Sequence, residues 1–393
     1  MMAGRRPPET GHRAELLESG AEYFPALLRA IDAAQHELLL ETYIYADDPS
    51  GRAVTEALLR AAARGVRVVA LIDGFGASGH IGTLAERLRS GGVALRFYRP
   101  IRALAHLRFA RLQRLHRKLL TVDGRLAFIG GINIHDDANL TDPRLQGRYD
   151  FAVAITGPLV RPLRAAQRKL MGRALRRRVP PQLPSAAGEP PWLASWERLK
   201  RVARARLVLR DNFLHRHAIE RAYLEAIDRA RSQIWIANAY FIPGRRLLQA
   251  LARARARGVA VRLMLQGHPE YWFVREAERA LYDLLLAQGI ELLEYRRGFL
   301  HAKVAVIDAR WATVGSSNLD PFSLLLSHEA NVVIEDEAFA AELRERLERA
   351  AREHGHRVTP VQWSRQRGWP RLRARLVYAL TRLALRLIGF ARY

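Results

Sequence analysis

HRKLLTVDGRLAFIGGIN (residues 116–133) and HAKVAVIDARWATVGSSN (residues 301–318) follow one template. Each begins with a histidine, followed by a lysine two positions later, an aspartate at seven, a glycine at fourteen and an asparagine at seventeen. Five residue types that recur at one spacing indicate an internal repeat. The chain of 393 residues is therefore predicted to consist of two related halves.

The segments upstream of the two motifs match in the same order. Residues 37–74 and 232–267 both read as an apolar strand, an amphipathic helix and a strand opened by Arg-Gly-Val. Strands that alternate with helices predict an α/β fold with helices on the faces of a sheet. A stretch rich in Pro, Ser, Ala and Gly separates the halves and reads as a linker. The predicted boundaries are 1–177 for the first half, 178–200 for the linker, 201–355 for the second half and 356–393 for a C-terminal segment.

The composition restricts the kind of partner. The formal net charge is +25, which favours a polyanion such as nucleic acid or an anionic membrane surface, although an arginine-rich genome would also produce it. The absence of cysteine excludes disulfides, thiolate metal sites and thiol nucleophiles. No run of about 18 uncharged apolar residues is present, so no membrane-spanning helix is expected. The N-terminal stretch has no apolar core of a secretory signal.

Each motif is predicted to form a β-hairpin that turns at its aspartate. This register places Lys118 opposite Gly130 and Lys303 opposite Gly315, with the histidine and lysine on one face of the strand. The glycines should leave room for a ligand, and Asn133 and Asn318 should add amide donors to the same wall. Each half would then bind one oxyanion, and two facing halves would form a doubled site.

The residue types favour phosphoryl transfer. A His-x-Lys pair is a poor metal site because the ammonium repels a cation, so neither a metal nor another cofactor is expected. Lys118 and Lys303 can supply the positive charge that a transferring phosphoryl group requires. His116 and His301 can divide the remaining work, since one can attack phosphorus while the other protonates the leaving oxygen.

Four acidic residues complete the predicted site. Asp150 and Glu329 each follow a motif and open a strand, so they are candidates to orient the histidines. Asp123 and Asp308 complete the motifs and belong to the predicted catalytic set, but their position at the turns favours a structural role. A single His-x-Lys pair would most simply indicate a solvated edge strand; its recurrence with matched glycine and asparagine favours a functional site.

The pattern His-x-Lys-x4-Asp followed by Gly-x-x-Asn resembles the signature of the phospholipase D superfamily, and the resemblance covers about residues 15–350. It implies two tandem α/β sandwich domains related by a pseudo-two-fold axis, with the site in the cleft between them. It also implies a metal-free reaction through a phosphohistidine. The usual assignment in this superfamily makes His116 the nucleophile and His301 the general acid and then base, although the sequence alone does not break the symmetry.

Within the superfamily, the stretches LETYIYADDPSG (40–51), ANAYFIPG (237–244) and WATVGSSNLDPFSLLLSHEANVVI (311–334) are similar to short bacterial cardiolipin synthases. This resemblance implies transfer of a phosphatidyl group from phosphatidylglycerol or phosphatidylethanolamine to phosphatidylglycerol. Anionic and zwitterionic phospholipids are then the expected partners, nucleic acid is not expected, and the oligomeric state stays open. Gly131 stands where many members have serine, which suggests that the two half-sites are not equivalent.

The C-terminal segment is predicted to attach the protein to a membrane surface. Between 370 and 393, leucines fall on one helical face with arginines beside it, which is typical of an interfacial helix. Trp363 and Trp369 precede it and suit the headgroup level. The alternative is a helix packed on the core. The basic segment 99–118 would contact headgroups at the cleft mouth, or would simply cap the domain. The expected location is the cytoplasmic face of the bacterial inner membrane, as a peripheral protein.

Three other functions fit parts of the pattern. In a phospholipase D-type hydrolase, water rather than a lipid alcohol would resolve the phosphohistidine. A phosphodiesterase nuclease of the same superfamily would suit the charge, but the amphipathic C-terminal segment favours lipid. An inactive membrane-binding scaffold is disfavoured, because histidine and lysine are intact in both copies.

Overall fold

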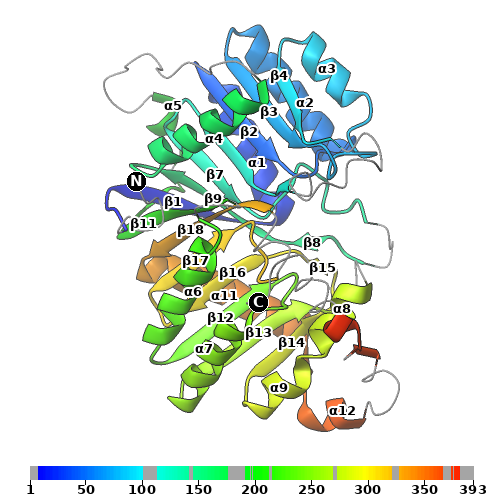
Figure 1. Cartoon of the computed structure of the whole chain (residues 1–393). Coiled ribbons are helices and arrows are strands. Elements are labelled where there is room, and N and C mark those ends of the chain that lie inside the picture. Colours follow the sequence, from blue (N-terminus) through cyan, green and yellow to red (C-terminus); the bar gives the residue numbers. More distant parts are fainter. Residues whose placement is uncertain are drawn as a thin grey trace.

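The computed structural model describes residues 8–100, 113–140, 145–175, 191–194, 196, 198–211, 215–268, 272–320, 327–365, 373–374 and 376–380. Figure 1 shows two halves stacked one on the other, each built on a sheet with helices packed on it. No helix within these ranges is long and apolar enough to cross a membrane.

The first half is an eight-stranded sheet with the order β10-β1-β9-β7-β6-β2-β3-β4. Its strands are β1 (His12–Glu18), β2 (Glu37–Thr42), β3 (Arg67–Asp73), β4 (Ala94–Tyr98), β6 (Lys118–Val122), β7 (Leu126–Gly130), β9 (Phe151–Thr156) and β10 (Lys200–Val202). Its helices are α1 (Ser19–Ala33), α2 (Pro49–Ala63), α3 (Leu84–Ser90), α4 (Val160–Leu175) and the short α5 (Pro191–Ala194). β2, β3 and β4 run parallel, as strand–helix–strand units require.

The second half repeats this plan in the order β11-β18-β17-β16-β12-β13-β14-β19. Its strands are β11 (Arg204–Arg210), β12 (Gln233–Asn238), β13 (Ala260–Gln266), β14 (Glu291–Tyr295), β16 (Lys303–Ile307), β17 (Trp311–Gly315), β18 (Ser327–Glu335) and β19 (Gly355–Val358). Its helices are α6 (Ala218–Arg229), α7 (Arg245–Ala256), α8 (Trp272–Arg279), α9 (Tyr282–Ala287), α11 (Glu337–His354) and α12 (Pro360–Arg365).

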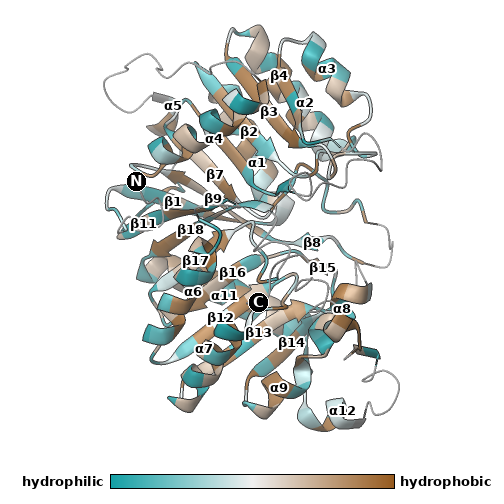
Figure 2. Cartoon of the chain, viewed as in Figure 1, coloured by the Kyte–Doolittle hydropathy of each residue, from teal (hydrophilic) through white to brown (hydrophobic). Residues whose placement is uncertain are grey.

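The apolar core continues from one half into the other. Ile129 and Val153 of the first sheet belong to the same buried cluster as Val304 and Val314 of the second. Two further clusters lie under α1 and α2 in the first half and under α6 and α7 in the second. Figure 2 shows the apolar strands inside and polar residues on the outer helices. The halves are therefore joined by a common core, which fixes how their edges meet.

The two motifs form the predicted hairpins. Lys118 pairs with Gly130 across β6 and β7, and Val304 pairs with Val314 across β16 and β17, which is the predicted register. The turn aspartates, Asp123 and Asp308, have positive φ angles of 50° and 51°. Their carboxylates accept backbone amides at the start of the neighbouring strand, such as that of Glu37 at 2.8 Å from Asp123. Both aspartates therefore hold the turn of a hairpin, at the end remote from its histidine.

Two very short strands cross between the halves. β5 (Arg114–Leu115) pairs with β18 of the second half, and β15 (Phe299–Leu300) pairs with β8 (Arg148–Tyr149) of the first. Each of them ends one residue before a motif histidine. The backbone amide of His116 donates to the carbonyl of His328 at 3.1 Å, and that of His301 donates to the carbonyl of Tyr149 at 2.8 Å. Each histidine is thus held against the opposite half of the molecule.

Candidate active site

The two motif histidines are each held by a carboxylate from the opposite half. Nδ1 of His116, in the first half, lies 3.0 Å from Oε1 of Glu329 on β18. Nδ1 of His301, in the second half, lies 2.5 Å from Oδ2 of Asp150, which directly precedes β9. The sequence predicted both carboxylates, and the structure shows that the pairing is reciprocal. In both rings Nδ1 is engaged, so Nε2 is the nitrogen available for chemistry.

The proton on the His116 ring is assigned by its partners. Besides Glu329, Nδ1 lies 3.1 Å from the backbone oxygen of Ser316, which can only accept a hydrogen bond. Nδ1 therefore carries the hydrogen and Nε2 carries a lone pair. Burial lowers the pKa of His116, and Lys118 lowers it further, against the opposing effect of Glu329. The ring is consequently neutral with a free lone pair, which is the form a nucleophile needs.

The His301–Asp150 pair has a different balance. Burial raises the pKa of Asp150 to about 7, although Lys303 opposes this. Burial and the two motif lysines hold the pKa of His301 well below its usual value. When Asp150 is protonated, its hydroxyl donates to Nδ1 of the neutral ring, and Nε2 of His301 then carries the hydrogen. That arrangement is suited to a proton donor.

The motif lysines complete the centre. Lys118 Nζ donates to the backbone oxygen of His116 at 2.7 Å, and Lys303 Nζ donates to that of His301. Lys303 Nζ also lies 3.9 Å from Asp150. Both side chains are buried, and burial lowers the pKa of Lys118 to about 7. An anionic ligand would favour the ammonium form, so the site gains positive charge as a phosphate enters.

The motif glycines and asparagines support the strands around this centre. A Cβ on Gly130 would lie 2.5 Å from Ala152 Cα, and one on Gly315 would lie 2.2 Å from the Asn331 side chain. The space beside the glycines therefore serves packing against the next strand. Asn133 accepts the backbone amide of Ile44 at 3.1 Å, and Asn318 is buried. Phosphate binding by these four residues stays a prediction.

The structure gives a physical reason for Gly131, which stands where many members of the superfamily have serine. A Cβ on Gly131 would lie 2.4 Å from both carboxylate oxygens of Asp150. At the corresponding place in the second half, Ser316 Oγ donates to Glu329 at 2.5 Å. The shorter carboxylate thus occupies the space where the other half has a serine side chain. The half-sites differ in construction, as expected from Gly131.

Sequence reasoning missed two residues that position His116. The ring of Tyr43 lies 4.9 Å from the His116 ring and 5.3 Å from Lys118 Nζ, whereas Ala239 stands at the corresponding position after β12. Asp73, at the end of β3, accepts the backbone amide of Leu115 at 2.7 Å. Both residues lie at the ends of strands that the repeat had already identified, so a position-by-position comparison of the halves could have drawn attention to them.

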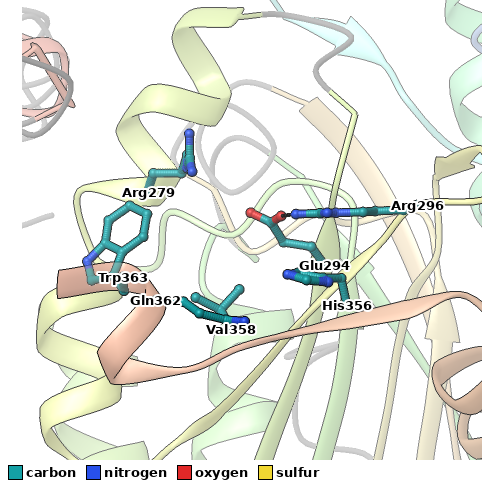
Figure 3. A pocket seen from close by; sticks show the side chains of 7 residues that line it. All are labelled: Arg279, Glu294, Arg296, His356, Val358, Gln362 and Trp363. Carbon is teal, nitrogen blue, oxygen red and sulfur yellow. Dashed lines mark hydrogen bonds and ion pairs between the residues drawn. The ribbon is translucent and has the colours of Figure 1, made fainter. Parts of the chain in front are cut away.

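Other features of the described residues do not form a second centre. No group of three or more His, Cys, Asp or Glu side chains in the described ranges could hold a metal ion. A cavity of about 40 Å³ lies between α8, β14, β19 and α12 (Figure 3). There, Arg296 contacts Glu294 at 2.7 Å, and Arg279 lies over the ring of Trp363. No motif residue lines this cavity.

Two His-Lys hairpins that share one centre across two α/β halves define a double-motif protein of the phospholipase D superfamily. A model described as "Cardiolipin synthase, PLD-like domain" matches residues 27–163 and 223–351. The chain belongs to this family of phospholipase D-like cardiolipin synthases. The family and the tandem α/β fold expected from the motifs are thereby confirmed.

Relatives and solved structures agree with this assignment. Cardiolipin synthase B of Escherichia coli (strain K12) is 40% identical over 346 residues, which cover 86% of this chain and 80% of that protein. Cardiolipin synthase A of Pseudomonas entomophila (strain L48) is 31% identical over 345 residues, covering 88% of this chain and 70% of that protein. The crystal structure of phosphatidylserine synthase from Haemophilus influenzae Rd KW20 superposes with a TM-score of 0.68 at 15% identity, covering 99% of this chain and 98% of that chain. This last likeness concerns the fold alone.

Proposed function

We propose that the protein is a cardiolipin synthase that transfers a phosphatidyl group from phosphatidylglycerol or phosphatidylethanolamine to phosphatidylglycerol. The observation that carries the proposal is the reciprocal centre, in which His116 and His301 are held by carboxylates of the opposite half beside two buried lysines. Membership of the cardiolipin synthase family supports the same substrate class.

In the first step, Nε2 of His116 attacks the phosphorus of the donor lipid. The bond from phosphorus to the headgroup oxygen breaks, and Nε2–H of His301 gives its proton to that oxygen. The result is a phosphatidyl-histidine and a free headgroup alcohol. Lys118 and Lys303 supply positive charge to the oxygens of the pentacoordinate transition state.

In the second step, the primary hydroxyl of phosphatidylglycerol gives its proton to Nε2 of His301 and its oxygen attacks phosphorus. The phosphorus–nitrogen bond breaks, cardiolipin forms, and His116 regains its lone pair. The order of the two histidines is supported by the fixed hydrogen on Nδ1 of His116, which the Ser316 carbonyl requires. It is also supported by the raised pKa of Asp150, which lets the second pair retain a proton for donation.

The decisive experiment incubates purified protein with phosphatidylglycerol vesicles, with and without phosphatidylethanolamine, and resolves the lipids by mass. Cardiolipin that still forms in the presence of chelator is the expected product. Phosphatidic acid as the main product would instead assign a hydrolase. Cleavage of DNA without any lipid product would overturn the proposal in favour of a nuclease.

Because its substrates reside in a bilayer, we place the enzyme peripherally on the cytoplasmic face of the bacterial inner membrane. The C-terminal segment 370–393 supports this location through its leucine face and arginine stripe. Residues 366–372, 375 and 381–393, and residues 101–112 of the basic segment, lie outside the described residues. Deletion of 370–393 is expected to weaken sedimentation with anionic vesicles; unchanged binding would refute a membrane role for this segment.

A further inference from the structure

Three large aromatic side chains are exposed after equivalent strands of the two halves. The large apolar side chains strongly exposed among the described residues are Phe75, Trp272, Phe273, Leu284, Val361, Leu376 and Leu380. Phe75 lies two residues after β3, whereas Trp272 and Phe273 open α8, the next element after β13; β3 and β13 are equivalent strands of the two halves. Trp272 is 64% exposed and Phe75 is 53% exposed. An exposed cluster of this kind marks a surface that meets an apolar partner.

The topology places these aromatics at the mouth of the site. β13 runs parallel to β12, and the end of β12 pairs with Lys303 through Asn238, so β13 ends at the sheet edge where the second motif begins; α8 is the next element along the chain. In the first half, Asp73 binds the backbone amides of both Phe75 and Leu115, and Leu115 directly precedes His116. Phe75 is therefore linked through Asp73 to the residue before His116, and Trp272 and Phe273 follow the strand that ends beside the second motif.

The helix that carries Trp272 and Phe273 is firmly mounted. Glu276 of α8 forms a bidentate pair with Arg373, with contacts of 2.9 and 3.2 Å. Glu278 accepts the backbone amide of Phe241 at 3.0 Å, and Arg279 lies 5.1 Å from the Trp363 ring centre (Figure 3). The aromatic tip is consequently held outward by a fixed helix, instead of belonging to a loose loop that could fold back.

The C-terminal helix lies beside α8 (Figure 1). Ala374 is buried, so the described part of this helix packs on the second half through Ala374 and Arg373. Leu376 and Leu380 of the predicted apolar face are nevertheless 49% and 62% exposed. The helix therefore adds two exposed leucines to a segment that an ion pair joins to α8.

Charge identifies the occupant of this rim. Arg114 lies 5.6 Å from the ring centre of Phe75. Aromatic side chains next to arginine suit the headgroup level of a bilayer. A second copy of the chain, with its own net charge of +25, would be repelled, whereas an anionic lipid surface is attracted.

We propose that Phe75, Trp272 and Phe273 form a lipid-contacting rim that seats the mouth of the catalytic cleft directly on an anionic bilayer. The proposal rests on the proposed lipid substrate, and goes beyond attachment by the C-terminal segment, because the cleft itself meets the lipid. The enzyme then takes both donor and acceptor from the bilayer without lifting either lipid through water.

The test compares the double variant Trp272→Ser/Phe273→Ser and the single variant Phe75→Ser with Val361→Ser. Val361 is the matched control, because it is 63% exposed but follows β19, which runs away from the cleft edge. Sedimentation with vesicles of phosphatidylglycerol and phosphatidylcholine should show binding weakened by about tenfold in the double variant and less in Phe75→Ser. Binding of Val361→Ser should match the parent protein.

A second measurement protects the test against misfolding. In the unaltered protein, brominated lipids should quench tryptophan fluorescence, and Trp272→Phe should remove a large part of that quenching. Turnover of short-chain phosphatidylglycerol below its micelle concentration should be unchanged in the double variant. If the parent protein does not turn over that soluble lipid, the proposed function is wrong. The vesicle-binding measurement would still show whether the rim contacts lipid.

Two results would overturn the proposed rim. One is vesicle binding by the double variant that equals that of the parent protein, together with unaltered quenching in Trp272→Phe. The other is a loss of oligomeric mass in analytical ultracentrifugation with vesicle binding unaffected, which would assign the rim to contact between copies of the chain.

Discussion

The two half-sites have the same plan but differ in their parts. His116 is held by a glutamate that also accepts the hydroxyl of Ser316, and its ring lies against Tyr43. His301 is held by the shorter Asp150, whose space is kept open by Gly131. The first histidine is thus fixed by several acceptors and an aromatic wall, the second mainly by one short contact.

This difference teaches how a duplicated motif can serve two chemical roles. A nucleophile benefits from one fixed tautomer, and the Ser316 carbonyl supplies it. A group that first donates and later accepts a proton benefits from a partner that titrates near neutrality, and burial raises the pKa of Asp150 to about 7. If the roles are divided in this way, equivalent substitutions in the two half-sites should have unequal effects.

Replacing either histidine should remove transfer almost completely, by about 10⁴-fold or more, because both steps need both groups. The variants should differ in trapping. With a donor whose leaving group needs no proton, His301→Ala should still accumulate a phosphatidyl-histidine, and His116→Ala should not. Radiolabelled donor and gel separation measure the adduct. An adduct in His116→Ala alone would reverse the assigned order.

Replacing the two carboxylates by amides should reduce turnover unequally. Asp150→Asn removes the titratable carboxyl that shares a proton with Nδ1 of His301, and a loss of about 10³-fold is expected. Glu329→Gln should cost about 10²-fold, because the Ser316 carbonyl still directs Nδ1 of His116. Initial rates of cardiolipin formation test this order. Equal losses would mean that the carbonyl contributes nothing to tautomer selection.

Exchanging the glycine and serine at the equivalent positions 131 and 316 should also reduce turnover unequally. Gly131→Ser places a Cβ 2.4 Å from the Asp150 oxygens and must displace that carboxylate, so turnover should fall by about 10²-fold. Ser316→Gly removes one hydrogen bond to Glu329, which is worth about 1–3 kcal/mol, and roughly tenfold is expected. Steady-state kinetics with circular dichroism as the folding control would distinguish the two, and a neutral Gly131→Ser would contradict the steric explanation.

The smallest expected effect is the pH dependence of anion binding. Because burial lowers the pKa of Lys118 to about 7, its ammonium is present below pH 7 and is lost above it in the empty site. Competitive inhibition by dimethyl phosphate, whose single charge does not titrate in this range, should weaken by up to about tenfold per pH unit above 7. Lys118→Arg should reduce this dependence, since guanidinium stays protonated. A flat profile in the unaltered protein would contradict the lowered pKa.

Much of the fold could be predicted because the same turn residues and strand patterns occur in both halves of the sequence. The pairing of Lys118 with Gly130 followed from the turn at Asp123 and the two-residue period of a strand. The family followed from the same motifs. These features depend on residues close together in sequence, where spacing alone determines geometry.

The pairing of each histidine with a carboxylate of the opposite half could not be predicted, because it depends on how the two sheets pack together. Nothing near residue 116 indicates that β5 pairs with β18 or that Glu329 reaches His116, since those contacts arise from packing between the halves. The reason for Gly131 was hidden in the same way, because its neighbour Asp150 is set by the position of β9. Tyr43 was overlooked because an apolar strand end looks alike whether or not it faces a catalytic ring.

The reciprocal pairing also has a consequence for biosynthesis. While the ribosome is still making the second half, His116 has emerged but neither Glu329 nor the Ser316 carbonyl exists to orient it. In a truncated product that ends before residue 329, Glu329 is missing and cannot orient the ring of His116. Such a product is therefore expected not to form a stable phospholipid adduct. Both halves must therefore be translated before either histidine can react, so phosphatidyl transfer begins only after translation of the chain is complete.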